Sequence, residues 1–88
     1  MAKYNVLYTE AFYRSLKPIP KRDVVRILRK TKMLADDPRP VGSQKLSGQE
    51  KYRIRQGDYR IIYSIEDDRL IVVVVNVGNR RDVSDRGK

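Results

Sequence analysis

The sequence predicts an α+β fold, a small, largely antiparallel four-stranded sheet with an N-terminal αα-hairpin packed on one face, in the order β-α-α-β-β-β. Three observations predict it. Apolar residues recur at helical spacing over residues 21–35, two alternating runs meet at Gly57, and residues 70–77 are almost continuously apolar. The 88 residues suffice for a single domain spanning 1–88, and not for two.

The first elements are a strand and a short helix. Residues 3–8 alternate between tyrosine or valine on one side and other residues on the other, which predicts a strand. Thr9 is a residue type that caps helix N-termini, so a helix is expected over about residues 10–17. Pro18 and Pro20 interrupt this helix and force a turn.

A second helix is expected from about residue 21 to residue 35. It ends at residues 36–40, which contain two aspartates and two prolines. Two helices joined by a tight turn form an αα-hairpin. The apolar stripe of the second helix consists of Val24, Ile27, Leu28, Thr31, Leu34 and Ala35, and its basic residues Arg22, Arg26, Arg29, Lys30 and Lys32 lie largely off that stripe.

The second half of the chain predicts three strands. Residues 38–50 form a connection that contains Pro, Gly and Ser, and residues 51–65 then form a hairpin around Gly57. Residues 70–77 are apolar on both faces except at Asn76, which is typical of a strand in the middle of a sheet. Gly78 is expected to end that strand.

The hairpin is expected to gather arginines on one face. Successive strand residues point to opposite faces, so Arg53 and Arg55 share a face of the first strand. If the loop is Gln56-Gly57, Arg53 lies opposite Arg60, and if it is Gly57-Asp58, Arg55 lies opposite Arg60. In both registers the three arginines share one face of the hairpin.

Such a grouping of like charges is unfavourable for the fold, by a few tenths to about 1 kcal/mol for a directly opposed pair. One interpretation is a surface that binds phosphates. The alternative is that Asp58, Glu66 or another acid neutralises the arginines, or that they simply point into water. Tyr52, Tyr59 and Tyr63 alternate along the strands together with isoleucines and so lie on the other face. We therefore expect these tyrosines to be core residues and not surfaces on which RNA bases stack.

Composition limits the partners and the chemistry. The formal charge is +9, with 20 Lys and Arg against 11 Asp and Glu, which indicates a polyanionic partner such as nucleic acid, a ribosome, an acidic protein or an anionic membrane. The chain has no His and no Cys, which excludes histidine-based ribonuclease chemistry and argues against a zinc site. The longest apolar run, 70–75, is too short to span a bilayer, and no apolar signal segment begins the chain, so we expect a soluble, cytoplasmic protein.

Several motifs stand in a characteristic order along the chain. The hairpin contains Tyr-Arg-Ile-Arg at 52–55 and Gly-Asp-Tyr-Arg-Ile-Ile-Tyr at 57–63. The last strand continues into Val-Asn-Val-Gly-Asn-Arg-Arg-Asp-Val at 75–83, and the segment 38–46 leads to Gly48. In their order and spacing these motifs resemble the RelE/ParE toxin superfamily, and in particular the RelE-like mRNA interferases of type II toxin–antitoxin systems. The resemblance covers nearly the whole chain, and the β-α-α-β-β-β order fits it too.

The resemblance implies a ribosome-dependent endoribonuclease. Such toxins cut mRNA in the ribosomal A site, use the 2′-hydroxyl of the RNA as nucleophile, need no metal or other cofactor, and are neutralised by a cognate antitoxin. By position, the family's basic site residues match Arg53, Arg55, Arg60 and Arg80, which become the candidate catalytic residues. Lys45, Lys51 and Arg81 are further candidates for RNA binding.

One position departs from the family pattern. A tyrosine often stands near the C-terminus of these toxins, where this chain has Ser84. Serine can neither stack on a base nor supply a phenol, so a catalytically weak or non-catalytic RNA- or ribosome-binding member is one alternative. The other is an inhibitor of DNA gyrase, as in the ParE branch of the superfamily.

Overall fold

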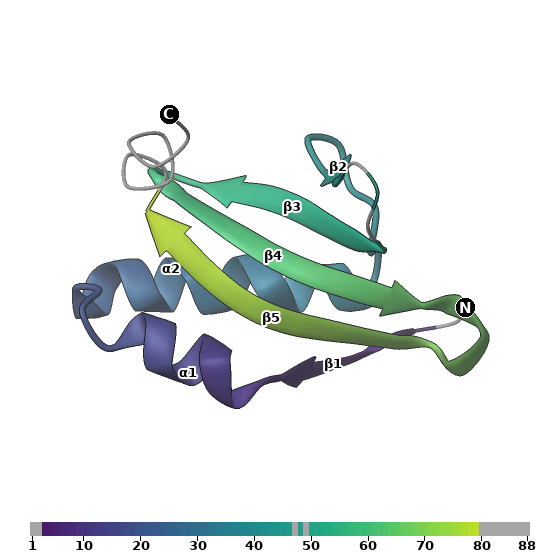
Figure 1. Cartoon of the computed structure of the whole chain (residues 1–88), viewed down its shortest axis with the longest axis horizontal. Helices are drawn as coiled ribbons and strands as arrows, with labels where there is room; N and C mark the ends of the chain where they lie inside the picture. Colours follow the sequence, from purple (N-terminus) through teal and green to yellow (C-terminus); the bar gives the residue numbers. More distant parts are fainter. Residues whose placement is uncertain (1–2, 47, 49, 80–88) are drawn as a thin grey trace.

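A five-stranded sheet in the order β1-β5-β4-β3-β2 carries two helices on one side (Figure 1). The structure, a computed structural model, describes residues 3–46, 48 and 50–79. In this part of the chain, no helix has the length and apolar character needed to cross a bilayer. In chain order the elements are β1 (Asn5–Tyr8), α1 (Glu10–Leu16), α2 (Lys21–Lys32), the 3-10 turn η1 (Met33–Ala35), β2 (Gln44–Lys45), β3 (Lys51–Gln56), β4 (Tyr59–Glu66), the 3-10 turn η2 (Asp67–Arg69) and β5 (Ile71–Asn79).

The predicted fold class is confirmed, and the sheet has one strand more than expected. The strands β3, β4 and β5 pair antiparallel, and β1 pairs parallel with β5. Because β5 has a neighbour on each side, it lies in the interior of the sheet. The additional strand, β2, has two residues and pairs with β3 through Gln44–Arg53 and Lys45–Tyr52. A strand this short cannot show an alternating pattern, so the sequence alone does not reveal it.

Both helices begin where expected, and the second ends earlier than expected. Thr9 caps α1, because the backbone N–H of Phe12 donates to Thr9 Oγ1 over 3.0 Å. The second helix begins after Pro20 and ends at Lys32, three residues before the predicted end. Those three residues continue as the tighter turn η1, a common way for a helix to end.

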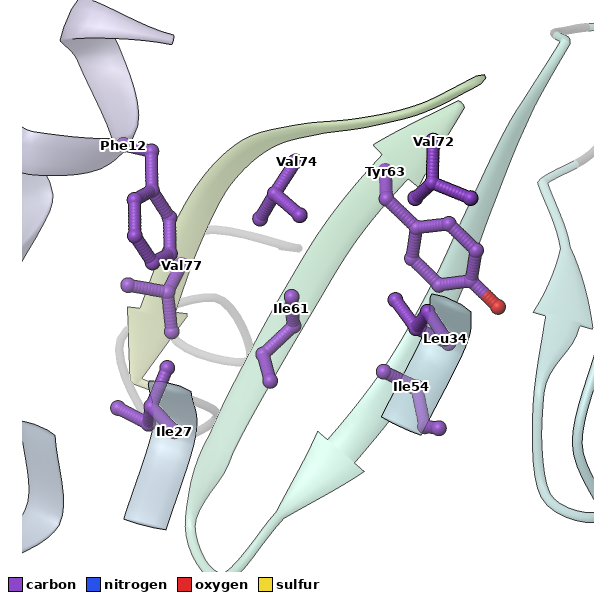
Figure 2. Packing of buried hydrophobic residues seen from close by; sticks show 9 residues of the cluster. All are labelled: Phe12, Ile27, Leu34, Ile54, Ile61, Tyr63, Val72, Val74 and Val77. Atoms are coloured by element: carbon purple, nitrogen blue, oxygen red, sulfur yellow. The ribbon is translucent and has the colours of Figure 1, made fainter. Parts of the chain in front are cut away.

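The core lies between the helices and one face of the sheet (Figure 2). Tyr63 is fully buried there, and its hydroxyl donates to the carbonyl of Pro38 over 2.8 Å. Tyr52 and Tyr59 pack against this core, so the prediction that the three tyrosines are core residues is confirmed. The buried apolar residues are Phe12, Ile27 and Leu34 from the helical half and Ile54, Ile61, Tyr63, Val72, Val74 and Val77 from the sheet.

Helix α1 protects the part of β5 that β1 does not reach. The pairing of β1 with β5 ends at Tyr8–Val74, and a bulge then shifts the register of β5 against β4. Thr9 donates its backbone N–H to the carbonyl of Val74 (3.1 Å) and its hydroxyl to the carbonyl of Val75 (2.6 Å). Further along, the N–H of Val77 donates to Ser15 Oγ over 3.2 Å. The helix therefore satisfies backbone groups that would otherwise form an open sheet edge.

A clasp of polar side chains closes the far end of the sheet. Arg39 donates to both carboxylate oxygens of Asp67, over 3.1 and 2.8 Å, and its Nε donates to the hydroxyl of Tyr52 over 3.2 Å. The hydroxyl of Tyr4 donates to the same carboxylate over 2.7 Å. Hydrogen bonds from Arg39 and then from Tyr4 lower the pKa of Asp67 from 3.8 to about 2. We call Tyr4, Arg39, Tyr52 and Asp67 the clasp.

Candidate functional site

The sheet face opposite the helices carries the three arginines of the hairpin. The register pairs Arg55 with Arg60 and Arg53 with Ile62, so Arg53, Arg55 and Arg60 project from the same side. The loop is Gly57-Asp58, with Gly57 at φ +60°, which is the second of the two predicted registers. A positive φ at the first loop position only is typical of a type II′ turn, which favours glycine there. We call this side of the sheet the arginine face.

Arg60 has the most unusual environment on this face. It is half-buried, and its Nε is enclosed with no hydrogen-bond partner among the residues that the structure describes. On β5 its neighbour in the register is Gly78, which has no side chain to occupy the space beside it. An enclosed donor without an acceptor is costly in a folded protein, and an anionic oxygen would satisfy it.

The other two arginines have different surroundings from Arg60. Arg53 donates from its guanidinium to Gln44 Oε1, which β2 brings alongside it, and Arg55 is exposed. Within residues 3–46, 48 and 50–79, none of the three forms an ion pair with a carboxylate. Glu66, a predicted neutralising acid, pairs instead with Arg69 over 3.3 Å. Among these residues, neutralisation by Asp58 or Glu66 is therefore not supported.

The two candidate lysines lie on different faces. Lys51 pairs with Ser64 and shares the arginine face with Arg53 and Arg55. Lys45 pairs with Tyr52, which points to the helix-covered side, and its amine lies 3.7 Å from Glu50. Lys45 therefore lies on the side of the sheet opposite the arginine face, and its assignment to RNA binding stays a prediction. The position of Lys45 depends on its register in a strand that the sequence does not reveal.

The remaining predicted site residues, Arg80, Arg81 and Ser84, lie outside the described residues. Gln44 is a member of the arginine face that the sequence analysis missed. Its neighbours show no periodicity, and only its pairing with Arg53 reveals its place. No group of three or more His, Cys, Asp or Glu residues that could hold a metal ion occurs in the described part of the chain.

The arrangement is suited to binding a phosphodiester. Arginine presents planar pairs of N–H donors that match phosphate oxygens, and three such groups from neighbouring strands surround one patch of the sheet. A guanidinium group is not deprotonated in proteins, so arginine serves as a hydrogen-bond donor and a cation and not as a base.

Comparisons with known proteins agree with this architecture. Residues 6–83 match the family model described as "ParE toxin of type II toxin-antitoxin system, parDE". The chain is 30% identical over 81 residues to a putative RelE-like toxin protein of Escherichia coli, covering 89% of this chain and 84% of that protein. It is also 30% identical over 84 residues to toxin RelG of Mycobacterium tuberculosis, covering 91% and 94% of the two chains.

A solved structure shows the same fold. A chain of the toxin–antitoxin complex RelBE2 from Mycobacterium tuberculosis superposes with a TM-score of 0.82 at 26% identity, covering 91% of this chain and 94% of that one. The family model covers most of the chain, and the alignments with the two relatives at 30% identity cover 84% and 94% of those proteins. This chain therefore belongs to the RelE/ParE superfamily of toxins from type II toxin–antitoxin systems.

Proposed function

We propose that this protein is a ribosome-dependent endoribonuclease that cleaves mRNA in the A site and acts in the cytoplasm. The observation that carries the proposal is the convergence of Arg53, Arg55 and Arg60 on the arginine face, with Arg60 Nε enclosed and without a partner among the described residues. The RelE names of the relatives support this branch of the superfamily. The formal charge of +9 favours a large polyanion as the partner.

In the proposed reaction, the 2′-hydroxyl oxygen of a nucleotide attacks the adjacent phosphorus and loses its proton. The bond from phosphorus to the 5′ oxygen of the next nucleotide breaks, and that oxygen takes up a proton. The negative charge on the phosphate oxygens increases in the transition state. Arg55 and Arg60, which face each other across the two strands, hold the phosphate in place and stabilise this charge.

A cognate antitoxin is part of the proposal. A structure similar to this chain is a complex of a toxin with its antitoxin, which supports a protein partner that binds and neutralises the toxin. The high positive charge of this chain favours an acidic partner.

The test is primer extension on a translated message after synthesis of the protein is induced. We expect cuts in register with codons that appear only while the message is translated. Arg60→Ala should lower the cleavage rate by about 10²–10³, because one preorganised donor to the developing charge is lost. Arg14→Ala is the matched control, because Arg14 is an exposed arginine on α1 that pairs only loosely with Glu10, at 3.8 Å. If Arg60→Ala cuts as fast as Arg14→Ala, the proposed site is wrong.

A second candidate function is inhibition of DNA gyrase, as in the ParE branch. The observation in its favour is the family model itself, which is described as a ParE toxin. A supercoiling assay with purified gyrase separates the two functions. Inhibition at stoichiometric toxin, together with intact mRNA in the primer-extension experiment, would favour gyrase as the target.

A further inference from the structure

A groove runs along the outer edge of β3, next to the arginine face. One part has a volume of about 400 Å³ and is lined by Lys30 of α2, by Gln44, and by Arg53 and Arg55. A second part of about 210 Å³ continues along α2 past Arg26, Arg29 and again Lys30. The groove therefore contains two arginines of the candidate site and three basic residues of α2. We call the six residues Arg26, Arg29, Lys30, Gln44, Arg53 and Arg55 the edge groove.

The charge of the edge groove has one sign. No acidic residue is among the residues that line its two parts. Arg26 is partly compensated by Asp23 at 4.0 Å, while Arg29 and Lys30 have no ion pair with a described residue. The next hollow along the edge, beyond Gln56, is lined by Asp23 and Asp58 as well as by Arg26. The electrostatic field therefore favours binding of a polyanion near Arg29 and Lys30 over binding near the Gly57 turn.

We propose that the edge groove binds the phosphodiester backbone of the single-stranded RNA that flanks the cleavage position. This inference rests on the proposed function and extends it. Neighbouring strands lie about 4.8 Å apart, so the groove begins only about two strand spacings, ~10 Å, from Arg60. A strand of a few nucleotides can therefore lie on the arginine face and cross the β3 edge into the groove. With no aromatic side chain among the lining residues, the groove reads backbone charge and not base identity.

The geometry favours RNA over a peptide strand that would add to the sheet. The N–H of Leu46 donates to the carbonyl of Lys51 (2.8 Å), so every second residue of β3 from Lys51 onward directs its backbone groups to this edge. β2 already occupies the edge at Arg53. Only Arg55 then offers free backbone groups to a partner strand before the turn at Gly57. A peptide would gain at most two such hydrogen bonds, whereas an RNA backbone meets several cationic side chains.

The test measures binding of the purified full-length protein to labelled oligouridine by fluorescence anisotropy at several salt concentrations. A dinucleotide and an oligomer of about 12 nucleotides are compared, because the single phosphate of the shorter one cannot occupy the arginine face and the groove at once. For the longer oligomer, Arg29→Gln combined with Lys30→Gln should make the slope of log K against log salt less steep by about 1.4, at about 0.7 per phosphate contact. The shorter oligomer should bind this variant as it binds the parent.

The matched control is Arg22→Gln combined with Lys32→Gln. It removes the same charge from the same helix, keeps similar helix propensity, and changes two exposed residues that do not line the edge groove. We expect its slope to equal that of the parent. An equal loss in both double variants would mean a general effect of net charge and would overturn the proposal. Binding of polyglutamate with the same dependence on Arg29 and Lys30 would overturn the assignment to RNA.

Cleavage in a translation extract, measured on the same variants, separates this proposal from the proposed function. If the parent cuts no message but the groove variant still shows the reduced slope, the proposed function is wrong, and the edge groove binds RNA without a role in cleavage. If Arg60→Ala loses cleavage while the groove and control variants bind RNA alike, the function stands and the groove proposal is wrong.

Discussion

Arg55 and Arg60 show how a single cross-strand pair can lower stability at a binding surface. They face each other across β3 and β4, with no carboxylate of a described residue paired to either. Arg60 is also half-buried with an enclosed Nε. Like charges in this position repel each other, so this pair opposes folding while it favours an anionic ligand.

We expect Arg55→Gln to raise the free energy of unfolding by a few tenths to about 1 kcal/mol, because it removes the repulsion from Arg60. The gain should shrink as salt is added, since Arg55 is exposed and screening weakens the repulsion. Urea denaturation at low and high salt measures both effects. Arg53→Gln is the control, because Arg53 lies opposite Ile62 and donates to Gln44. A gain from Arg53→Gln of the same size would show that the effect comes from net charge and not from the pair.

At the scale of elements, Thr9, the single residue between β1 and α1, has several structural roles. Thr9 ends the strand, caps the helix and donates to the carbonyls of Val74 and Val75 in β5. These two carbonyls lie where β1 stops and the bulge of β5 begins. One hydroxyl group therefore links the start of α1 to β5, the strand next to β1 in the sheet.

Thr9→Ala should lower the free energy of unfolding by about 1–2 kcal/mol, the usual range for the loss of a helix cap. It also removes the hydrogen bond to Val75, so we expect a value in the upper part of that range. Thr9→Ser keeps both hydrogen bonds and should lie close to the parent. Thermal and urea unfolding measure the difference between the two variants. A serine variant as unstable as the alanine variant would show that the methyl group matters and the hydroxyl does not.

At the scale of the whole molecule, the clasp joins segments that are far apart in the chain. Arg39 comes from the connection after η1, Asp67 from η2, Tyr4 from the segment before β1, and Tyr52 from β3. The Arg39 guanidinium also lies over the ring of Tyr52, with 5.3 Å to its centroid. The clasp holds the long connection against the end of the sheet opposite to the Gly57 turn.

The clasp should weaken in acid. The pKa of Asp67 is lowered from 3.8 to about 2 in the folded protein, so the carboxylate stabilises the fold above about pH 4, and this contribution is lost as the pH falls toward 2. The difference in unfolding free energy between the parent and Asp67→Asn should therefore be largest above about pH 4 and shrink toward pH 2.

Asp68→Asn is the control for this pH dependence, because Asp68 is exposed and has no ion pair with a described residue. Its difference from the parent should not shrink in the same way. Urea denaturation in steps from pH 6 to pH 2, about one unit apart, measures both variants. A difference between parent and Asp67→Asn that does not change with pH would contradict the role assigned to the clasp.

The sequence by itself determined the elements and the composition of the two sheet faces. Helical spacing predicted α2, the proline pair predicted the turn before it, and strict alternation around Gly57 predicted that Arg53, Arg55 and Arg60 share a face. These are local properties, because the period of two residues in a strand assigns each side chain to a face before the strand has found its partners.

Only the tertiary structure decided which distant residues meet. In the folded protein Arg55, and not Arg53, lies opposite Arg60. Gln44 lies beside Arg53, and Lys45 lies on the other face of the sheet. The tertiary structure also brought Lys30 of α2 to the edge of β3 beside Arg55. Such contacts depend on turn geometry, on a two-residue strand and on the packing of helix against sheet, none of which leaves a periodic pattern in the chain. Local periodicity therefore assigned the arginines to one face, and long-range packing determined the shape of the surface around them.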